Sequence, residues 1–204
     1  MTNALSHHSQ NILAIHQLAT ADERVEGATW YLNALIIAED LGARYKLGGR
    51  LKAIGVIAAL SPRNRWERNV QDADALIAAF NAGGAEQARL TKVCTFGANK
   101  EKAIKILQLQ HASDTEILDI LSGPKLREFY NCIYGLADVC IDGHAYCIWN
   151  GGRTSLADVP AIGVKLRRQI KADYVAAAKE LGITPAACQA ITWVAWRRIH
   201  GIKN

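Results

Sequence analysis

Apolar residues recur at intervals of three and four positions along nearly the whole chain, and no stretch of useful length alternates between apolar and polar residues. A spacing of three and four places apolar side chains on one face of an α-helix, whereas alternation is typical of a β-strand. The hydrophobic pattern therefore predicts an all-α protein.

Two short patterns predict where helices begin. In residues 20–23 and again in residues 113–116, a threonine or serine is followed three positions later by glutamate, which is the pattern of a capping box. The first box is expected to open a long helix that stops at Gly42, because glycine often ends a helix. The second is expected to open a short helix that ends at Leu121.

Glycine and proline predict further boundaries. A helix is expected over residues 49–60, and another over about 66–80, ended by the pair Gly83 and Gly84. Residues 150–163 are rich in glycine and only weakly periodic, so we expect a loop there. Two more helices are expected to close the chain.

The chain has 204 residues, enough for one domain of ordinary size. We expect residues 1–204 to form a single helical domain and leave a division into two lobes open. In that alternative, a core of about 48–150 contains the hairpin described below, and 1–47 with 151–204 form the second lobe.

Charge is moderately basic, with a net charge of +5 and a sequence pI near 9.0. Residues 164–204 contain eight basic and two acidic residues, so this tail alone carries +6. Such a tail is either part of an electrostatic footprint for a polyanion or the solvated faces of two surface helices. The charge permits a nucleic-acid partner without requiring one.

Five cysteines are present without any C-x-x-C pair of the kind that builds zinc or iron–sulfur sites. We therefore expect reduced, mostly buried thiols and no metal or other cofactor. Residues 1–10 are polar, and no run of about eighteen apolar residues occurs. The expected location is the cytoplasm, with no membrane partner.

The most informative stretch runs from Leu-Ser-Gly-Pro-Lys at 121–125 to Ile-Asp-Gly-His-Ala at 141–145. A glycine turn between two helices leaves backbone N–H groups at the start of the second helix, where they bind phosphate. Asp142, just beyond that helix, would then face the group to which the phosphate belongs. These residue types, in this order, can bind the phosphate of a nucleic-acid backbone and carry out chemistry on the neighbouring nucleotide.

Several stretches resemble, in order and spacing, the helix-hairpin-helix superfamily of DNA glycosylases: residues 56–61, 97–100, 117–125 and 139–145. In that family the hairpin usually reads L-P-G-V-G-x-K-T-A, and an aspartate follows in a V-D-T-[HN]-V context. Asp142 matches the aspartate and His144 the [HN] position. The hairpin is two residues shorter here, and residues 62–66 replace the polar residues that usually follow L-S.

The resemblance implies a helix-hairpin-helix glycosylase-like fold and an enzyme that cleaves or exchanges the N-glycosidic bond of a flipped base in DNA. Asp142 would stabilise the positive charge that develops on the sugar or activate a nucleophile. Lys125 is the amine nucleophile that the resemblance implies, and His144 is a further catalytic candidate. Each of these residues also has an alternative without catalysis. Asp142 fits the N-cap of the following helix, Lys125 fits a solvated or phosphate-contacting lysine, and His144 fits a packing or hydrogen-bonding role.

Candidate contacts to nucleic acid come from three places in the chain. Arginine and lysine contact phosphates, and an aromatic plane stacks on a displaced base. For residues 63–66 the alternative is an ordinary surface turn in which Trp66 packs into the core. The candidates are Arg63, Asn64, Arg65 and Trp66, then Gly123 and Lys125 in the hairpin, and Arg197 and Arg198 near the end.

Two other functions stay open. One is a glycosylase-like transferase that modifies a thymine-derived base in bacteriophage DNA, which the shortened hairpin fits equally well. The other is a DNA-binding or protein-interaction module without catalysis. DNA, single- or double-stranded, is the expected partner, and the sequence leaves the oligomeric state open.

Overall fold

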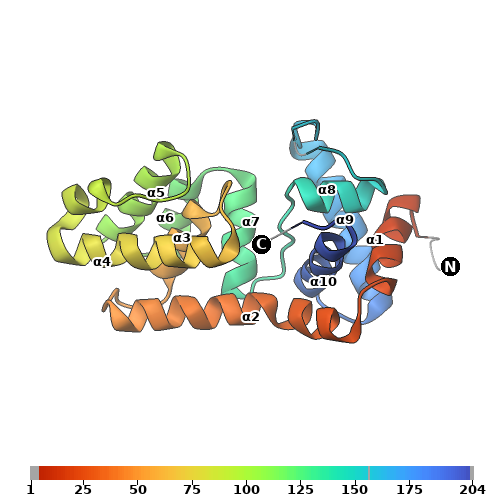
Figure 1. Cartoon of the computed structure of the whole chain (residues 1–204), viewed down its shortest axis with the longest axis horizontal. Helices are drawn as coiled ribbons and strands as arrows, with labels where there is room; N and C mark the ends of the chain where they lie inside the picture. The colour runs from red at the N-terminus through yellow and green to blue at the C-terminus, as the bar shows by residue number, and fades with distance from the viewer. Residues whose placement is uncertain (1–4, 156, 203–204) are drawn as a thin grey trace. The chain divides into compact units, whose positions relative to one another are not determined.

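The computed structural model describes residues 5–155 and 157–202. In these ranges the regular structure is helical throughout, with no strand, so the predicted all-α class is confirmed. The helices of the described ranges are labelled in Figure 1: α1 (His7–Gln17), α2 (Ala21–Arg44), α3 (Leu51–Leu60), α4 (Trp66–Leu90), α5 (Gly97–Gln108), α6 (Asp114–Leu121), α7 (Pro124–Tyr134), α8 (Gly143–Asn150), α9 (Val164–Leu181) and α10 (Pro185–Ile199).

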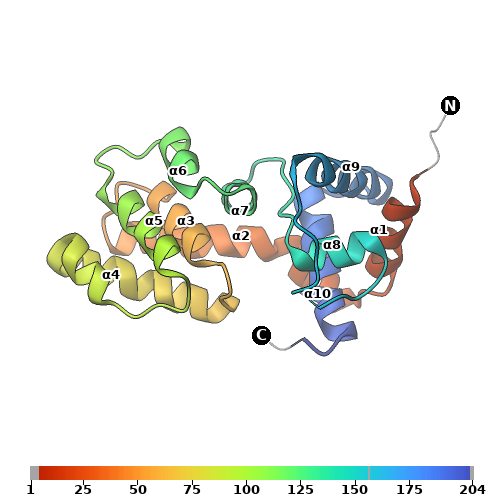
Figure 2. The same ribbon diagram turned by 90° about the horizontal axis from the view of Figure 1, so that it is seen from above.

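The chain divides into two compact units. The terminal unit takes its described residues from Met1–Tyr31 and Gly135–Lys203, and the central unit takes its residues from Leu32–Tyr134. Helix α2 therefore gives its first part to the terminal unit and the remainder to the central unit. The other helices of the terminal unit are α1, α8, α9 and α10, and those of the central unit are α3 to α7 (Figures 1 and 2).

Helix α3 is the core of the central unit. Its sequence is almost entirely apolar, and the residues from Ala53 to Leu60 are all buried, as expected for a helix that is hydrophobic on every side. It packs against α4, α5, α6 and α7. Gly55 permits a close approach, because a Cβ there would lie 2.9 Å from Cγ2 of Ile117 and 3.1 Å from Cδ1 of Ile106.

Apolar side chains of α1, α8, α9 and α10 form the core of the terminal unit. Ile12, Ile148, Ile170 and Trp196 contribute one side chain from each of these helices. Tyr174 is fully buried among them, and burial raises the pKa of its hydroxyl. The unit thus joins a helix from the start of the chain to three helices from its second half.

A buried carboxylate holds α1 in this unit. Asp173, on α9, is 9% exposed. Its Oδ1 accepts from Oγ of Ser6 at 2.5 Å and Oγ of Ser9 at 2.9 Å, and its Oδ2 accepts from Nε1 of Trp149 at 2.7 Å. Ser6 Oγ also caps α1 by accepting the N–H of Ser9. These donors offset the cost of removing the charge from water.

The two predicted capping boxes are confirmed. Thr20 Oγ1 accepts the N–H of Glu23 at 3.2 Å, and Oε2 of Glu23 accepts the N–H of Thr20 at 2.9 Å. Ser113 and Glu116 make the same reciprocal pair at the start of α6. The break predicted at Gly83 and Gly84 is also present, because the backbone of both residues leaves the helical conformation within α4.

Gly42 does not end α2, so that prediction is wrong. The helix continues to Arg44, and a Cβ on residue 42 would lie only 2.7 Å from the carbonyl oxygen of Gly49. A glycine suits this position because the chain following α2 passes directly over it. The helix ends later, in a turn where Leu47 N–H donates to the carbonyl of Gly42 at 2.9 Å.

No helix of the described ranges is long and apolar enough to cross a membrane. The five cysteines are free thiols, of which Cys94 is exposed and the other four are buried. Burial raises the pKa of the Cys188 thiol to about 12.

Candidate functional site

The predicted site residues are divided between the units. The central unit holds the predicted phosphate and base contacts at 63–66, Gly123 and Lys125, whereas the terminal unit holds Asp142, His144 and the arginines at 197–198. Each unit therefore supplies its own part of the predicted site.

The turn between α6 and α7 is built differently from the prediction. Ser122 has φ +56° and ψ −42°, and the N–H of Gly123 donates to the carbonyl of Leu121 at 2.6 Å, which is a three-residue γ-turn. Gly123 itself has no positive φ, so the assignment of the turn to this glycine is wrong. Because this N–H is already bonded and Pro124 has none, neither residue offers a backbone donor to a phosphate.

Basic side chains surround this turn. Nζ of Lys102 donates to the carbonyl of Leu121 at 2.8 Å and contacts Oγ of Ser122 at 2.9 Å, while Nε of Arg127 donates to a carbonyl of α6 at 2.8 Å. The carbonyl end of a helix is partly negative, so these cations stabilise it. Lys125 lies half-buried on the first turn of α7. The hairpin therefore carries Lys102 and Arg127, which the sequence pattern did not single out, in addition to Lys125.

Gly123→Ala is expected to change the free energy of unfolding by no more than about 0.5 kcal/mol. A Cβ there would meet only the carbonyl oxygen of Leu121, at 3.9 Å, and the φ angle suits any residue. Urea unfolding checks this. Gly151→Ala is the contrasting variant, because Gly151 has φ +78° and a Cβ there would lie 2.6 Å from Nδ2 of Asn11. If both variants lowered the free energy of unfolding equally, the γ-turn with Ser122 at its centre would be contradicted.

Asp142 is the N-cap of α8. Its Oδ1 accepts the N–H of Ala145 at 2.8 Å, and no other hydrogen bond to the carboxylate is found within the described residues. The side chain is half-buried. The hydrogen bond to Ala145 fixes the orientation of the carboxylate, and the N-terminus of α8 favours its negative charge. The second oxygen, Oδ2, remains available to another partner.

His144 follows on the first turn of α8. It lines a pocket of the terminal unit together with Cys147, one turn further along the helix. In the part of the chain that the structure describes, the imidazole ring makes no hydrogen bond to Asp142 or to any other residue.

The two arginines near the end of α10 have different surroundings. Arg198 donates to Oε1 of Glu23 at 2.6 Å and to the carbonyl of Leu18 at 2.7 Å, which ties α10 to the start of α2. This ion pair lowers the pKa of Glu23. The guanidinium of Arg197 lies 4.4 Å from the ring centroid of Trp193. Arg198 therefore has an internal structural role.

Residues 61–65, which join α3 to α4, pack against residues 91–96, which join α4 to α5. The buried carboxylate of Asp72, 2% exposed, connects the two segments. Its Oδ2 accepts from Nδ2 of Asn64 at 3.0 Å and from the N–H of Cys94 at 2.7 Å. Asn64, a predicted nucleic-acid contact, is thus used inside the unit to shape this pair of loops.

The exposed part of these loops combines charge with an aromatic ring. The guanidinium carbon of Arg63 lies 4.9 Å from the ring centroid of Phe96, a residue that is 50% exposed. Arg65 is exposed at the N-cap of α4. We call Arg63, Arg65 and Phe96 the Arg63–Phe96 surface. Trp66, expected to offer the aromatic plane, is half-buried.

Sequence reasoning missed Phe96 and Asp72. Phe96 directly precedes residues 97–100, one of the stretches that carried the resemblance, and that neighbourhood was the available signal. Asp72 lies within a helical pattern, where its local spacing marks only the i,i+4 ion pair with Arg68 at 2.7 Å. Its bond to the N–H of Cys94 spans 22 positions, and no local pattern marks that contact.

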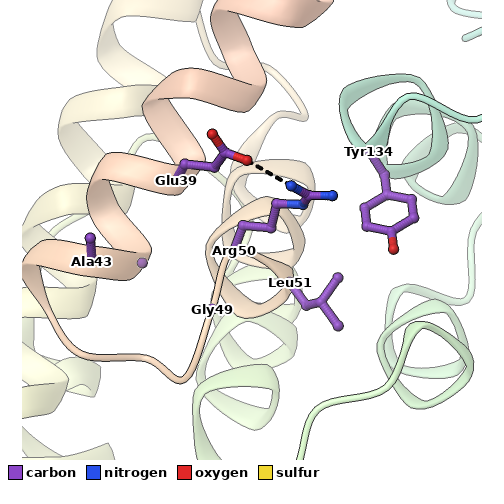
Figure 3. Close-up of a pocket in the computed structure, with 7 residues that line it drawn as sticks. Glu39, Ala43, Gly49, Arg50, Leu51 and Tyr134 are labelled. Atoms are coloured by element: carbon purple, nitrogen blue, oxygen red, sulfur yellow. Dashed lines mark hydrogen bonds and ion pairs between the residues drawn. The ribbon is translucent and has the colours of Figure 1, made fainter.

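A pocket of the central unit, of about 500 Å³, lies between α2, the start of α3 and the end of α7 (Figure 3). Nη1 of Arg50 donates to Oε1 of Glu39 at 2.7 Å, and its guanidinium lies 5.3 Å from the ring centroid of Tyr134. Because Glu39 balances the charge of Arg50, this pocket has no marked preference for an anion or a cation.

Within the described residues, no three side chains of histidine, cysteine, aspartate or glutamate are grouped to hold a metal ion. No curated protein and no solved structure is significantly similar to the chain. Residues 2–200 match a family described as "Family of unknown function (DUF7178)". Since the match spans nearly the whole sequence, the chain belongs to the DUF7178 family.

Proposed function

We propose that the protein acts on DNA as an enzyme of the DNA glycosylase type, cleaving or exchanging the N-glycosidic bond of an extruded base. The carboxylate of Asp142 carries the proposal, because one hydrogen bond of 2.8 Å orients it and one oxygen is left over. Breaking an N-glycosidic bond develops positive charge on the sugar, which an ionised carboxylate stabilises.

The proposed fold is that of the helix-hairpin-helix glycosylases. It is supported by the short helices α6 and α7, which are joined by a three-residue turn and precede Asp142 in the chain. Lys102 and Lys125 beside that turn favour a polyanionic partner, whereas Arg127 pairs with Asp119 at 3.2 Å.

The Arg63–Phe96 surface supports DNA as the partner. Neither Arg63 nor Arg65 has a carboxylate partner within the described residues, so both guanidinium groups are available to phosphates. An exposed ring such as that of Phe96 stacks on unpaired bases of any sequence. An enzyme that extrudes a base needs both kinds of contact.

Phe96→Ala is expected to weaken the binding of single-stranded DNA by about tenfold, because stacking on one base contributes about 1–3 kcal/mol. Arg63→Gln is expected to weaken it to a similar extent and, in addition, to reduce the slope of log affinity against log salt concentration by about one. Fluorescence anisotropy at several salt concentrations measures both quantities.

Lys105→Gln is the matched control for these variants. Lys105 is exposed on α5 in the same unit and makes no hydrogen bond or ion pair with another described residue. If Lys105→Gln weakened DNA binding as much as Arg63→Gln, only overall charge would matter and the Arg63–Phe96 surface would lose its role.

A DNA-binding module without catalysis is the second candidate. The capping bond of Asp142 favours it, because aspartate is a common N-cap and this bond alone accounts for its position.

One experiment separates the candidates. The protein and its Asp142→Asn variant are incubated with DNAs that carry normal, damaged and hypermodified bases, and the products are analysed by mass spectrometry. A free base released only by the unchanged protein supports excision. A new nucleoside supports modification of a thymine-derived base by a transferase. DNA that is bound by both proteins and remains unchanged supports the module.

A further inference from the structure

A pocket of about 370 Å³ lies in the terminal unit, between α8, α10 and the loop that follows α8. Its volume falls in the range of small-molecule sites, roughly 300–1,000 Å³. Trp196 of α10 forms one wall. The remaining polar lining comes from His144 and Cys147 on α8 and from Arg153, Thr154 and Ser155 in the loop.

Specific contacts hold the loop in place. Nη1 of Arg153 donates to the carbonyl of His200 at 3.0 Å, and Sγ of Cys147 lies 3.5 Å from Oγ1 of Thr154. Gly151 starts the loop with φ +78°, and a Cβ there would lie only 2.6 Å from Nδ2 of Asn11, so this position requires glycine. The lining groups are therefore positioned before any ligand binds.

The pocket presents donors and positive charge without a balancing carboxylate. Among the residues that the structure describes, no aspartate or glutamate lines it. Among the described residues, the guanidinium of Arg153 bonds only to the carbonyl of His200, which leaves most of its five N–H groups available. Oγ of Ser155 accepts the N–H of Ala157 at 3.2 Å, so its own hydrogen is free to be donated.

The charge of this region also affects a neighbouring histidine. His200 packs against Trp196 with ring centroids 4.0 Å apart. Burial, together with the nearby charges of Arg153 and His144, lowers the pKa of His200. Its buried Nε2 has no hydrogen-bond partner in the described chain.

We propose that this pocket binds the phosphate group of a nucleotide. Arginine forks and hydroxyl groups are the side chains that recognise phosphate oxygens, and the volume admits a sugar as well as the phosphate. The choice of a nucleotide as the carrier rests on the proposed function, whereas the preference for an oxyanion comes from the lining alone. The phosphate belongs either to the DNA chain or to a free nucleotide.

Calorimetric titration of the full chain with inorganic phosphate, thymidine monophosphate and thymidine tests the proposal. The monophosphate is expected to bind and thymidine to bind at least tenfold more weakly. Arg153→Gln should weaken binding of the monophosphate by about tenfold and Arg153→Lys by less, because lysine keeps the charge but not the fork. His144→Gln should weaken it by about threefold. Arg168→Gln, which removes an exposed charge from α9, should leave it within twofold.

Competition with DNA identifies the source of the phosphate. If thymidine monophosphate displaces DNA and Arg153→Gln weakens both, the phosphate belongs to the DNA chain. If DNA affinity is unaffected while monophosphate binding falls, the ligand is a free nucleotide.

Equal binding of thymidine and its monophosphate, or no effect of Arg153→Gln and His144→Gln, would overturn the proposal. His144→Gln decides the matter if Arg153→Gln fails to fold, because His144 makes no hydrogen bond in the described chain. These titrations measure binding and not catalysis. A negative result would therefore overturn the phosphate pocket without bearing on the catalytic role proposed for Asp142. Conversely, a protein without glycosylase activity could still bind the monophosphate in this pocket.

Discussion

Asp142→Asn is expected to lower the rate of base release or exchange by at least about 10³-fold, or about 4 kcal/mol of transition-state stabilisation. A neutral amide neither stabilises positive charge on the sugar nor activates a nucleophile. Its oxygen can still accept the N–H of Ala145, which Oδ1 of the aspartate accepts at 2.8 Å. Asparagine caps helices as well as aspartate, so stability should change by less than about 0.5 kcal/mol. Single-turnover rates and urea unfolding measure the two quantities.

Two control variants make this result specific. Asp158→Asn removes an exposed carboxylate from the same unit and should leave the rate unchanged. Asp142→Ala removes both the charge and the cap, so it should lose activity and also about 1 kcal/mol of stability. A rate for Asp142→Asn within threefold of the unchanged protein would exclude a catalytic role for this carboxylate.

Gly27→Ala is expected to lower the free energy of unfolding by about 3 kcal/mol. A Cβ at this position of α2 would lie 2.4 Å from Cα and 2.6 Å from the backbone nitrogen of Ile191 on α10. Beside this crossing, Oη of Tyr31 donates to Oε1 of Gln189 at 2.7 Å. Because the obstacle is backbone, the two helices must separate to admit a methyl group. Thermal and urea unfolding measure the loss.

The sign of this effect distinguishes packing from helix propensity. In an open helical position, alanine stabilises a helix by about 1 kcal/mol relative to glycine. Gly97→Ala provides the comparison, since Gly97 begins α5 and a Cβ there would meet nothing within 4 Å. It should be neutral or slightly stabilising. A stabilising effect of Gly27→Ala would contradict the close crossing of α2 and α10.

Features set by neighbours in the chain were predictable from the sequence. The boxes at 20–23 and 113–116 form between residues three positions apart, and the break at Gly83 and Gly84 follows from the backbone freedom of glycine. Asp142 as an N-cap belongs to this group, because its partner is Ala145. Its catalytic role, like the DNA partner, stays a prediction.

Features that depend on distant partners were missed or assigned to another cause. Residues 1–10 are polar and gave no predicted helix, yet α1 is held by Ser6 and Ser9 bonding to Asp173. Gly42 was taken as a helix end, whereas the approach of Gly49 explains it.

The candidate site also combines features that the sequence predicted with features that depend on distant partners. Its residue types, including the arginines at 63 and 65 and the carboxylate at 142, were evident from the sequence. The tertiary structure selected Phe96 as the exposed ring, used Asn64 to bind Asp72 and engaged Arg198 with Glu23. By itself, the sequence determined the helical class and several helix boundaries, among them both capping boxes and the break at Gly83 and Gly84, because helix periodicity and capping act over three or four residues. Only the tertiary structure decided which side chains are available to a ligand, because burial and hydrogen bonding there depend on residues far apart in the chain.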